Sequence, residues 1–147
     1  MMRHHLILRV VTKLLIGSIM LFALYVQFHG DYSPGGGFQA GVIMAVAFII
    51  YGIVFSLQDV QRVLPPWLVH KLSALGVLVY AGTGVVSFFT GYGFLDYAAL
   101  SPHHPVHGQH YGIILVELGV GITVTGVMIT IYYAFTSRTP VMDDEAW

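Results

Sequence analysis

Four long apolar stretches constrain this chain more than any other feature of its sequence. They run from about Val10 to Phe28, from Phe38 to Leu57, from Leu72 to Phe89 and from Ile113 to Phe135. An α-helix needs about 20 apolar residues to cross the hydrocarbon core of a bilayer, which is roughly 30 Å thick. We therefore expect an all-α, polytopic membrane protein with four transmembrane helices, in which residues 1–147 form a single membrane domain.

The composition excludes several classes of function. Only 9% of the residues are charged, whereas about a quarter are charged in a soluble domain. The net charge is -1 and no basic patch is interleaved with aromatic residues, so nucleic acid is not an expected partner. The absence of cysteine excludes disulfides, thiolate metal sites and cysteine nucleophiles. We expect no cofactor and no catalytic activity of the chain on its own.

The basic residues predict the orientation of the helices. Lys and Arg are retained on the cytoplasmic side of a membrane near the ends of its helices. The first and third connections contain none of them. The six basic residues are Arg3, Arg9 and Lys13 near the N-terminus, Arg62 and Lys71 in or beside the second connection, and Arg138 after the last stretch. Both termini are therefore expected in the cytoplasm, and the first and third connections outside.

The first connection is unusually rich in glycine. Its candidate structural residues are His29, Asp31, Pro34, Gly35, Gly36, Gly37 and Phe38. Glycine permits positive φ angles and close approach of another backbone, so the segment suits a tightly packed subunit interface. It also suits a cluster of N–H groups that favours an anion at the start of the second helix. A nucleotide-binding loop is excluded, because the Lys-Ser/Thr pair and a preceding strand are missing.

The stretch from Gly30 to Gly41 resembles the signature of the B subunit of Mrp-type multisubunit sodium/proton antiporters. In that family a Gly-His-Asn-x-Pro-Gly-Gly-Gly-Phe pattern links the first two helices. The last apolar stretch adds the family's acidic-x-Gly-Val pattern as Glu117-Leu118-Gly119-Val120. The sequence departs from the family by having Asp31-Tyr32 in place of His-Asn, and Glu117 where many members have Asp.

The resemblance implies an accessory or ion-path subunit of a multisubunit antiporter, and the complex as a whole would exchange a monovalent cation, Na⁺, for H⁺. Its partners would be other Mrp-type antiporter subunits and the lipid bilayer, in the inner (cytoplasmic) membrane of the cell. Related subunits also belong to membrane-bound hydrogenases and similar respiratory complexes, so the host complex stays open. A purely structural assembly scaffold is the alternative from another class of function.

Glu117 is the only acidic residue inside the four apolar stretches. A charge at the centre of a membrane helix costs about 2.5–3.5 kcal/mol on insertion scales, so such a residue normally faces protein and serves a function. Helical spacing places His110, Glu117, Gly121 and Thr125 on one face. That face can line a hydrated ion path, with Glu117, Thr125 and His110 as its polar groups, or it can pack closely against another helix.

The third connection holds a cluster of histidines. His103, His104, His107 and His110 are interspersed with Pro102 and Pro105. Imidazole binds zinc and titrates near neutral pH. This spacing matches no zinc motif, and the connection's only carboxylate, Asp96, lies well upstream. We expect no metal site here.

The predicted topology can be tested with single cysteines at Ser33 or Ser101. Both positions are expected to react with a membrane-impermeant maleimide from outside the cell, because all Lys and Arg residues lie on the opposite side. Labelling from the cytoplasmic side alone would reverse the predicted orientation.

Overall fold

The computed structural model describes residues 6–30, 35–101 and 104–138 of the chain. These residues form α1 (Leu6–Phe28), α2 (Gly37–Val54), α3 (Leu57–Val63), α4 (Pro66–Phe89), the 3₁₀ helix η1 (Tyr97–Leu100) and α5 (Pro105–Thr136), with no strand among them. The helices α1, α2, α4 and α5 are each long and apolar enough to cross a membrane. The expected all-α fold with four candidate membrane-spanning helices is confirmed.

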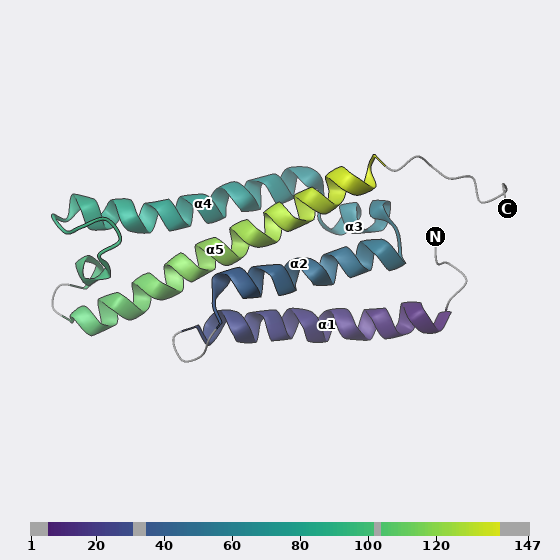
Figure 1. Cartoon of the computed structure of the whole chain (residues 1–147), viewed down its shortest axis with the longest axis horizontal. Helices are drawn as coiled ribbons and strands as arrows, with labels where there is room; N and C mark the ends of the chain where they lie inside the picture. The colour runs from purple at the N-terminus through teal and green to yellow at the C-terminus, as the bar shows by residue number, and fades with distance from the viewer. Residues whose placement is uncertain (1–5, 31–34, 102–103, 139–147) are drawn as a thin grey trace.

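The four long helices lie side by side in the order α1, α2, α5 and α4 (Figure 1). Two hairpins, α1–α2 and α4–α5, are joined because α5 packs against α2 as well as against α4. Most large side chains of α1 are exposed, for example Leu14 and Leu21. Such apolar surface suits contact with lipid or with neighbouring membrane helices.

Close approach of two backbones holds α4 against α5. A Cβ atom placed on Gly76 would lie 2.6 Å from the carbonyl oxygen of Gly119, and one placed on Gly119 would lie 2.9 Å from the carbonyl oxygen of Gly76. Only glycine fits at such a crossing. Small residues are favoured between membrane helices for this reason, since lipid provides no hydrophobic force that drives helices together.

A short helix, α3, connects α2 and α4 in the second connection. The Ser56 hydroxyl accepts a hydrogen bond from the Asp59 N–H at 3.0 Å and donates one to the Asp59 carboxylate at 2.7 Å. This capping arrangement starts α3. As a result α2 ends at Val54 rather than at residue 57, and α4 begins at Pro66 rather than at residue 72.

The best-packed part of the described chain lies where α3 meets α2, α4 and α5. Val60, Val69 and Ile129 are almost fully buried there. The Tyr133 hydroxyl donates a hydrogen bond to the carbonyl oxygen of Leu64 at 2.8 Å. This bond ties the end of α5 to the end of α3. We refer to this end of the bundle as the α3 end. The opposite end contains the glycine-rich first connection, from Gly30 to Gly37, which we call the glycine segment. We refer to that end as the glycine-segment end.

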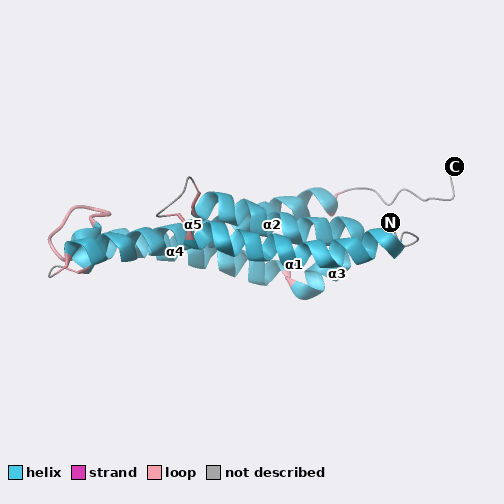
Figure 2. Ribbon diagram, turned by 90° about the horizontal axis from the view of Figure 1, so that it is seen from below, coloured by secondary structure: helices cyan, strands magenta, loops and turns pink. Residues whose placement is uncertain are grey.

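At the glycine-segment end, α5 begins at Pro105, eight residues before the apolar stretch predicted from residue 113. Proline is well accommodated in the first turn of a helix, and hydropathy marks the apolar part of a helix rather than its start. With 32 residues, α5 is roughly 48 Å long at 1.5 Å per residue. The paired ends of α4 and α5 extend beyond α1 and α2 (Figure 2).

The helix η1 covers the first turns of α5. A Cβ atom on Gly112 would collide with the Tyr97 ring, so the ring lies directly on the backbone of α5. Burial raises the pKa of the Tyr97 hydroxyl, and the nearby Tyr80 hydroxyl raises it further. Tyr97 therefore stays protonated near neutral pH, and its role here is packing.

The packing of α4 on α5 can be tested by comparing two glycines of α4. Gly76→Ala should lower the free energy of unfolding by about 1–3 kcal/mol, the usual cost of overpacking. Gly82→Ala should be neutral or slightly stabilising, because nothing lies within 4 Å of its Cβ position and alanine favours helix. Thermal unfolding in detergent gives both values. Equal losses in the two variants would contradict this account of the contact.

Candidate functional site

Glu117 lies on α5 at the level where α1 ends and α2 begins. Its side chain is half-buried. It is twelve residues along α5 from Pro105 (117 minus 105), and hence roughly 18 Å from the start of the helix at 1.5 Å per residue. The helix α5 projects past the α1–α2 hairpin (Figure 1), and Glu117 lies at the end of that hairpin, next to Gly30, Gly36 and Gly37.

The backbone of the first connection lies directly against Glu117. A Cβ atom on Gly30 would collide with the Glu117 carboxylate, and one on Gly36 would lie 2.8 Å from Oε1. A Cβ atom on Gly37 would collide with the backbone carbonyl oxygen of Glu117. The glycines are thus needed at this position because they allow the chain to lie against the carboxylate and the helix that carries it. The glycine segment and the intramembrane acid, which are far apart in the sequence, meet at one place in the fold.

The electrostatic surroundings of Glu117 include the N-terminus of α2. Gly36 is the N-cap residue of α2 and provides no side-chain cap, and the first turn contains no acidic residue. A negative charge near a helix N-terminus is stabilised by the helix dipole and by unpaired N–H groups. The five described Lys and Arg residues belong to the far end of the bundle, at the start of α1, in α3, at the start of α4 and after α5.

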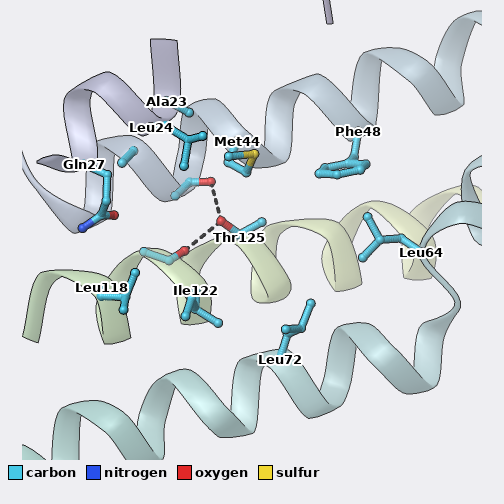
Figure 3. A pocket seen from close by; sticks show the side chains of 13 residues that line it. Ala23, Leu24, Gln27, Met44, Phe48, Leu64, Leu72, Leu118, Ile122 and Thr125 are labelled. Carbon is cyan, nitrogen blue, oxygen red and sulfur yellow. Dashed lines mark hydrogen bonds between the residues drawn. The ribbon is translucent and has the colours of Figure 1, made fainter. Parts of the chain in front are cut away.

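Further polar groups continue along the same side of α5. Thr125 follows Glu117 by eight residues, and its hydroxyl lies 2.7 Å from the carbonyl oxygen of Gly121 and 3.1 Å from that of Gly41 (Figure 3). The Thr125 hydroxyl therefore donates to its own helix and to α2. The side-chain oxygen of Gln27 occupies the space that a Cβ on Gly121 would need. Glu117, Gln27 and Thr125 form a polar line between α5 and the α1–α2 hairpin.

Gln27 is a site residue that the sequence did not predict. It lies at the very end of the first apolar stretch, next to the polar first connection, so the sequence alone does not distinguish it from a loop residue. The one feature that could have drawn attention to Gln27 is that it is the only amide side chain of the first apolar stretch. Its partner surface on α5 follows only from the packing of the helices.

The remaining predicted site residues are dispersed. His110 is exposed on α5, seven residues before Glu117, with its ring centroid 6.2 Å from that of Tyr111. His29 is exposed at the end of α1, and its Nδ1 lies 3.0 Å from the Tyr25 carbonyl oxygen. Phe38 is 63% exposed on α2. Asp31 and Pro34 lie outside the described residues, and Gly35 is half-buried just before α2.

The histidines of the third connection are only partly described, since His103 lies outside the described residues. The His104 and His107 rings meet edge to face with centroids 5.8 Å apart. Within the described ranges no group of three or more His, Asp or Glu side chains is placed to hold a metal ion. The absence of a metal site stays a prediction.

A groove opens on one face of the helix row beside the polar line. Its volume is about 250 Å³. The lining is mostly apolar and comes from all four long helices and the end of α3. Among its side chains are Leu24, Gln27, Met44, Phe48, Leu72 and Thr125 (Figure 3).

Comparison with known proteins identifies the family. The family model described as a domain related to the MnhB subunit of Na⁺/H⁺ antiporter matches residues 7–130. This chain belongs to the MnhB family. The matched range contains the glycine segment, Glu117 and Thr125, so the resemblance seen in the sequence is confirmed over most of the chain.

Two staphylococcal relatives of this MnhB-family chain are similar over nearly their whole length. The chain is 36% identical to a Staphylococcus haemolyticus protein named "Putative antiporter subunit mnhB2" over 138 residues, which are 92% of this chain and 97% of the relative. It is 35% identical to a protein of the same name from Staphylococcus aureus strain Newman over 133 residues, which are 89% of this chain and 94% of the relative.

The contact between Gly30 and Glu117 in this MnhB-family chain can be tested with a double-mutant cycle. Gly30→Ala should lower the thermal stability of the purified protein, because the added methyl group meets the Glu117 carboxylate. In a Glu117→Ala background the same change should cost much less, since contacting residues are coupled by about 0.5–3 kcal/mol. Gly17→Ala is the matched control, with nothing within 4 Å of its Cβ position. Additive effects of the two changes would disprove the contact.

Proposed function

We propose that this chain is a membrane subunit of a multisubunit Na⁺/H⁺ antiporter, in which Glu117 belongs to the path of the ions or couples the subunit to their movement. The observation that carries the proposal is the position of Glu117. It is the only carboxylate of the four apolar stretches, and it lies against the glycine backbone at the end of the α1–α2 hairpin. An acidic residue at such a depth is costly and is normally retained for function.

The polar line gives this carboxylate neighbours that suit a hydrated path. On the side of Glu117 toward the α3 end, the Gln27 side-chain oxygen lies against Gly121, and the Thr125 hydroxyl lies between α5 and α2. Carboxylate, amide, hydroxyl and carbonyl oxygens are all suitable ligands for a hard cation and for water. His110, two turns before Glu117 on α5, would lie at the entrance from the glycine-segment end. The role of each of these residues is part of the proposal.

Partner subunits are needed to complete such a path. The four helices form a single row, and a row of helices cannot by itself enclose an aqueous pore within a bilayer. Autonomous transporters typically bring repeated halves together around a site at mid-membrane. The proposed setting is therefore a hetero-oligomer of Mrp-type subunits in the inner membrane of the cell, with both termini in the cytoplasm and no catalytic reaction carried out by this chain. An antiporter-like module of a respiratory complex is the alternative host.

A purely structural role for Glu117 is the second candidate, and a specific observation favours it. The carboxylate lies next to the N-cap of α2, which lacks a side-chain cap of its own. In this role the Glu117 carboxylate of α5 would accept hydrogen bonds from the unpaired N–H groups at the start of α2, as an N-cap side chain does. A lost cap costs about 0.5–2 kcal/mol, which is enough to weaken assembly. The two roles differ in what a neutral side chain of the same size would do.

Replacing Glu117 by Gln distinguishes the two roles. If Glu117 belongs to the ion path, Glu117→Gln should assemble normally and lose Na⁺/H⁺ exchange by roughly tenfold or more, within the usual range of coupling between sites. Glu117→Asp should keep part of the activity, because it keeps the carboxylate. Exchange is measured in vesicles that contain matched amounts of assembled complex.

Thr130→Val serves as the control for the loss of a polar side chain on α5. It removes the hydroxyl that donates to the Gly126 carbonyl, lies outside the polar line, and should leave both assembly and exchange unchanged. Loss of assembly in Glu117→Gln would favour the structural role. Unchanged exchange, with unchanged Na⁺ and pH dependence, would exclude Glu117 from the ion path.

A further inference from the structure

Two cations at the α3 end, Arg9 and Lys13, lie on the same face of α1 as the groove. Arg9 and Gln27 are eighteen residues apart on α1 (27 minus 9), which is five full turns at 3.6 residues per turn. They therefore lie on the same side of the helix, and Gln27 lines the groove. Lys13 and the groove residue Leu24 are eleven residues apart (24 minus 13), which is about three turns. The cations and the groove share one face of α1.

The facing wall of α2 continues in the same way. Phe48 lines the groove, and Phe55 follows it by seven residues, about two turns. The Arg9 guanidinium carbon lies 4.9 Å from the centroid of the Phe55 ring, and the Lys13 ammonium lies 5.6 Å from the same centroid. The Phe55 side chain is only 6% exposed, and both cations make a cation–π contact with its ring.

The charges of Arg9 and Lys13 are not balanced within the described part of the chain. Arg62 is paired with Asp59 at 3.6 Å, whereas no carboxylate of residues 6–30, 35–101 and 104–138 lies within 4.0 Å of Arg9 or Lys13. Like charges one turn apart on a helix repel each other. An anion placed between them would remove this repulsion and form two charge-assisted hydrogen bonds.

The distance between the cations and the groove matches a lipid. From Lys13 to Leu24, α1 rises roughly 16 Å at 1.5 Å per residue. Half of a bilayer's hydrocarbon core is about 15 Å thick. An anionic headgroup at Arg9 and Lys13 would thus lie at the membrane surface, and its acyl chain would reach the level of Leu24.

The volume of the groove suits part of an acyl chain better than a helix. Its volume is about 250 Å³, and an apolar cavity of about 150 Å³ can hold one benzene molecule. An α-helix with its side chains is roughly 10–12 Å across, and even three turns of it would need several times the volume of the groove. In the same proportion the groove would hold about ten carbon atoms, which is a large part of one acyl chain.

We propose that an anionic phospholipid binds to this subunit, with its phosphate between Arg9 and Lys13 beside Phe55 and with one acyl chain in the groove lined by Leu24, Met44 and Phe48. The bound lipid covers the apolar face where the two hairpins meet. It contacts Leu72 of α4 as well as α1 and α2, so it strengthens the contact between the hairpins. Gln27 and Thr125 line the same groove, so the acyl chain would end short of them, at Leu24 and Met44, and the proposal does not depend on the role of Glu117.

Photolabelling of the assembled complex tests the proposal. The complex is reconstituted in phosphatidylcholine bilayers that contain a trace of phosphatidylglycerol with a diazirine near the end of one acyl chain, or phosphatidylcholine with the same diazirine. Cross-linked peptides are identified by mass spectrometry. We expect the phosphatidylglycerol probe to label the peptides that contain Leu24 and Met44, several times more strongly than the phosphatidylcholine probe does.

Variants identify the two parts of the site. The double variant R9Q/K13Q should lower labelling by phosphatidylglycerol by about tenfold or more, because each basic residue near a membrane surface strengthens binding of anionic lipid roughly fivefold. The matched control R62Q/K71Q removes two basic residues of the same end, one paired with Asp59 and one lying over Trp67, and should leave labelling unchanged. Leu24→Trp should block the groove, and Leu21→Trp, at an exposed position outside it, should not.

Three results would overturn the proposal. Equal labelling by the two probes would remove the role of the anionic headgroup. Unchanged labelling in R9Q/K13Q would remove the role of the cations. Absence of groove labelling, together with loss of a partner subunit from the complex of the Leu24→Trp variant, would show that a protein covers the groove.

Discussion

Close contact between the backbone of α5 and its two neighbours is the constraint on which this fold depends. In a membrane, helices gain little from hiding apolar surface, so they associate where their backbones can approach and pack. Gly76 and Gly119 allow this between α4 and α5, and Gly37 and Gly41 allow it between α2 and α5. The same contact brings the first connection onto Glu117. The contacts at Gly37 and Gly41 join the two hairpins, and the α1–α2 hairpin is one wall of the candidate site.

The shape of the molecule explains why it functions as a subunit. A single row of helices leaves both of its faces available to lipid or to other membrane proteins, and large apolar side chains are exposed along α1 and α4. The polar line of Glu117, Gln27 and Thr125 lies where α5 faces α1 and α2. A protein built in this way can contribute one wall to an ion path, and it relies on its neighbours for the others.

Several features of the protein follow from its sequence alone. Apolar length predicts four spanning helices, and the glycine segment together with Glu117-Leu118-Gly119-Val120 predicts the family. The ends of the helices are predicted less well. The helix α3 and the first eight residues of α5 are too polar to be recognised by hydropathy. Local contacts favour them instead. Ser56 caps α3, and η1 covers the first turns of α5. The roles of the individual site residues stay predictions.

The sequence by itself determined that this is an all-α membrane protein of the MnhB family, because span length and local glycine motifs are properties of continuous segments. Only the tertiary structure decided that Gly30 and Gly36 lie against Glu117, that Gln27 lies at Gly121, and that Arg9 and Lys13 meet at the Phe55 ring. These contacts join residues that are tens of positions apart. They depend on which faces of the helices meet, and in a membrane that choice is made by backbone packing between helices rather than by the apolar pattern within any one of them.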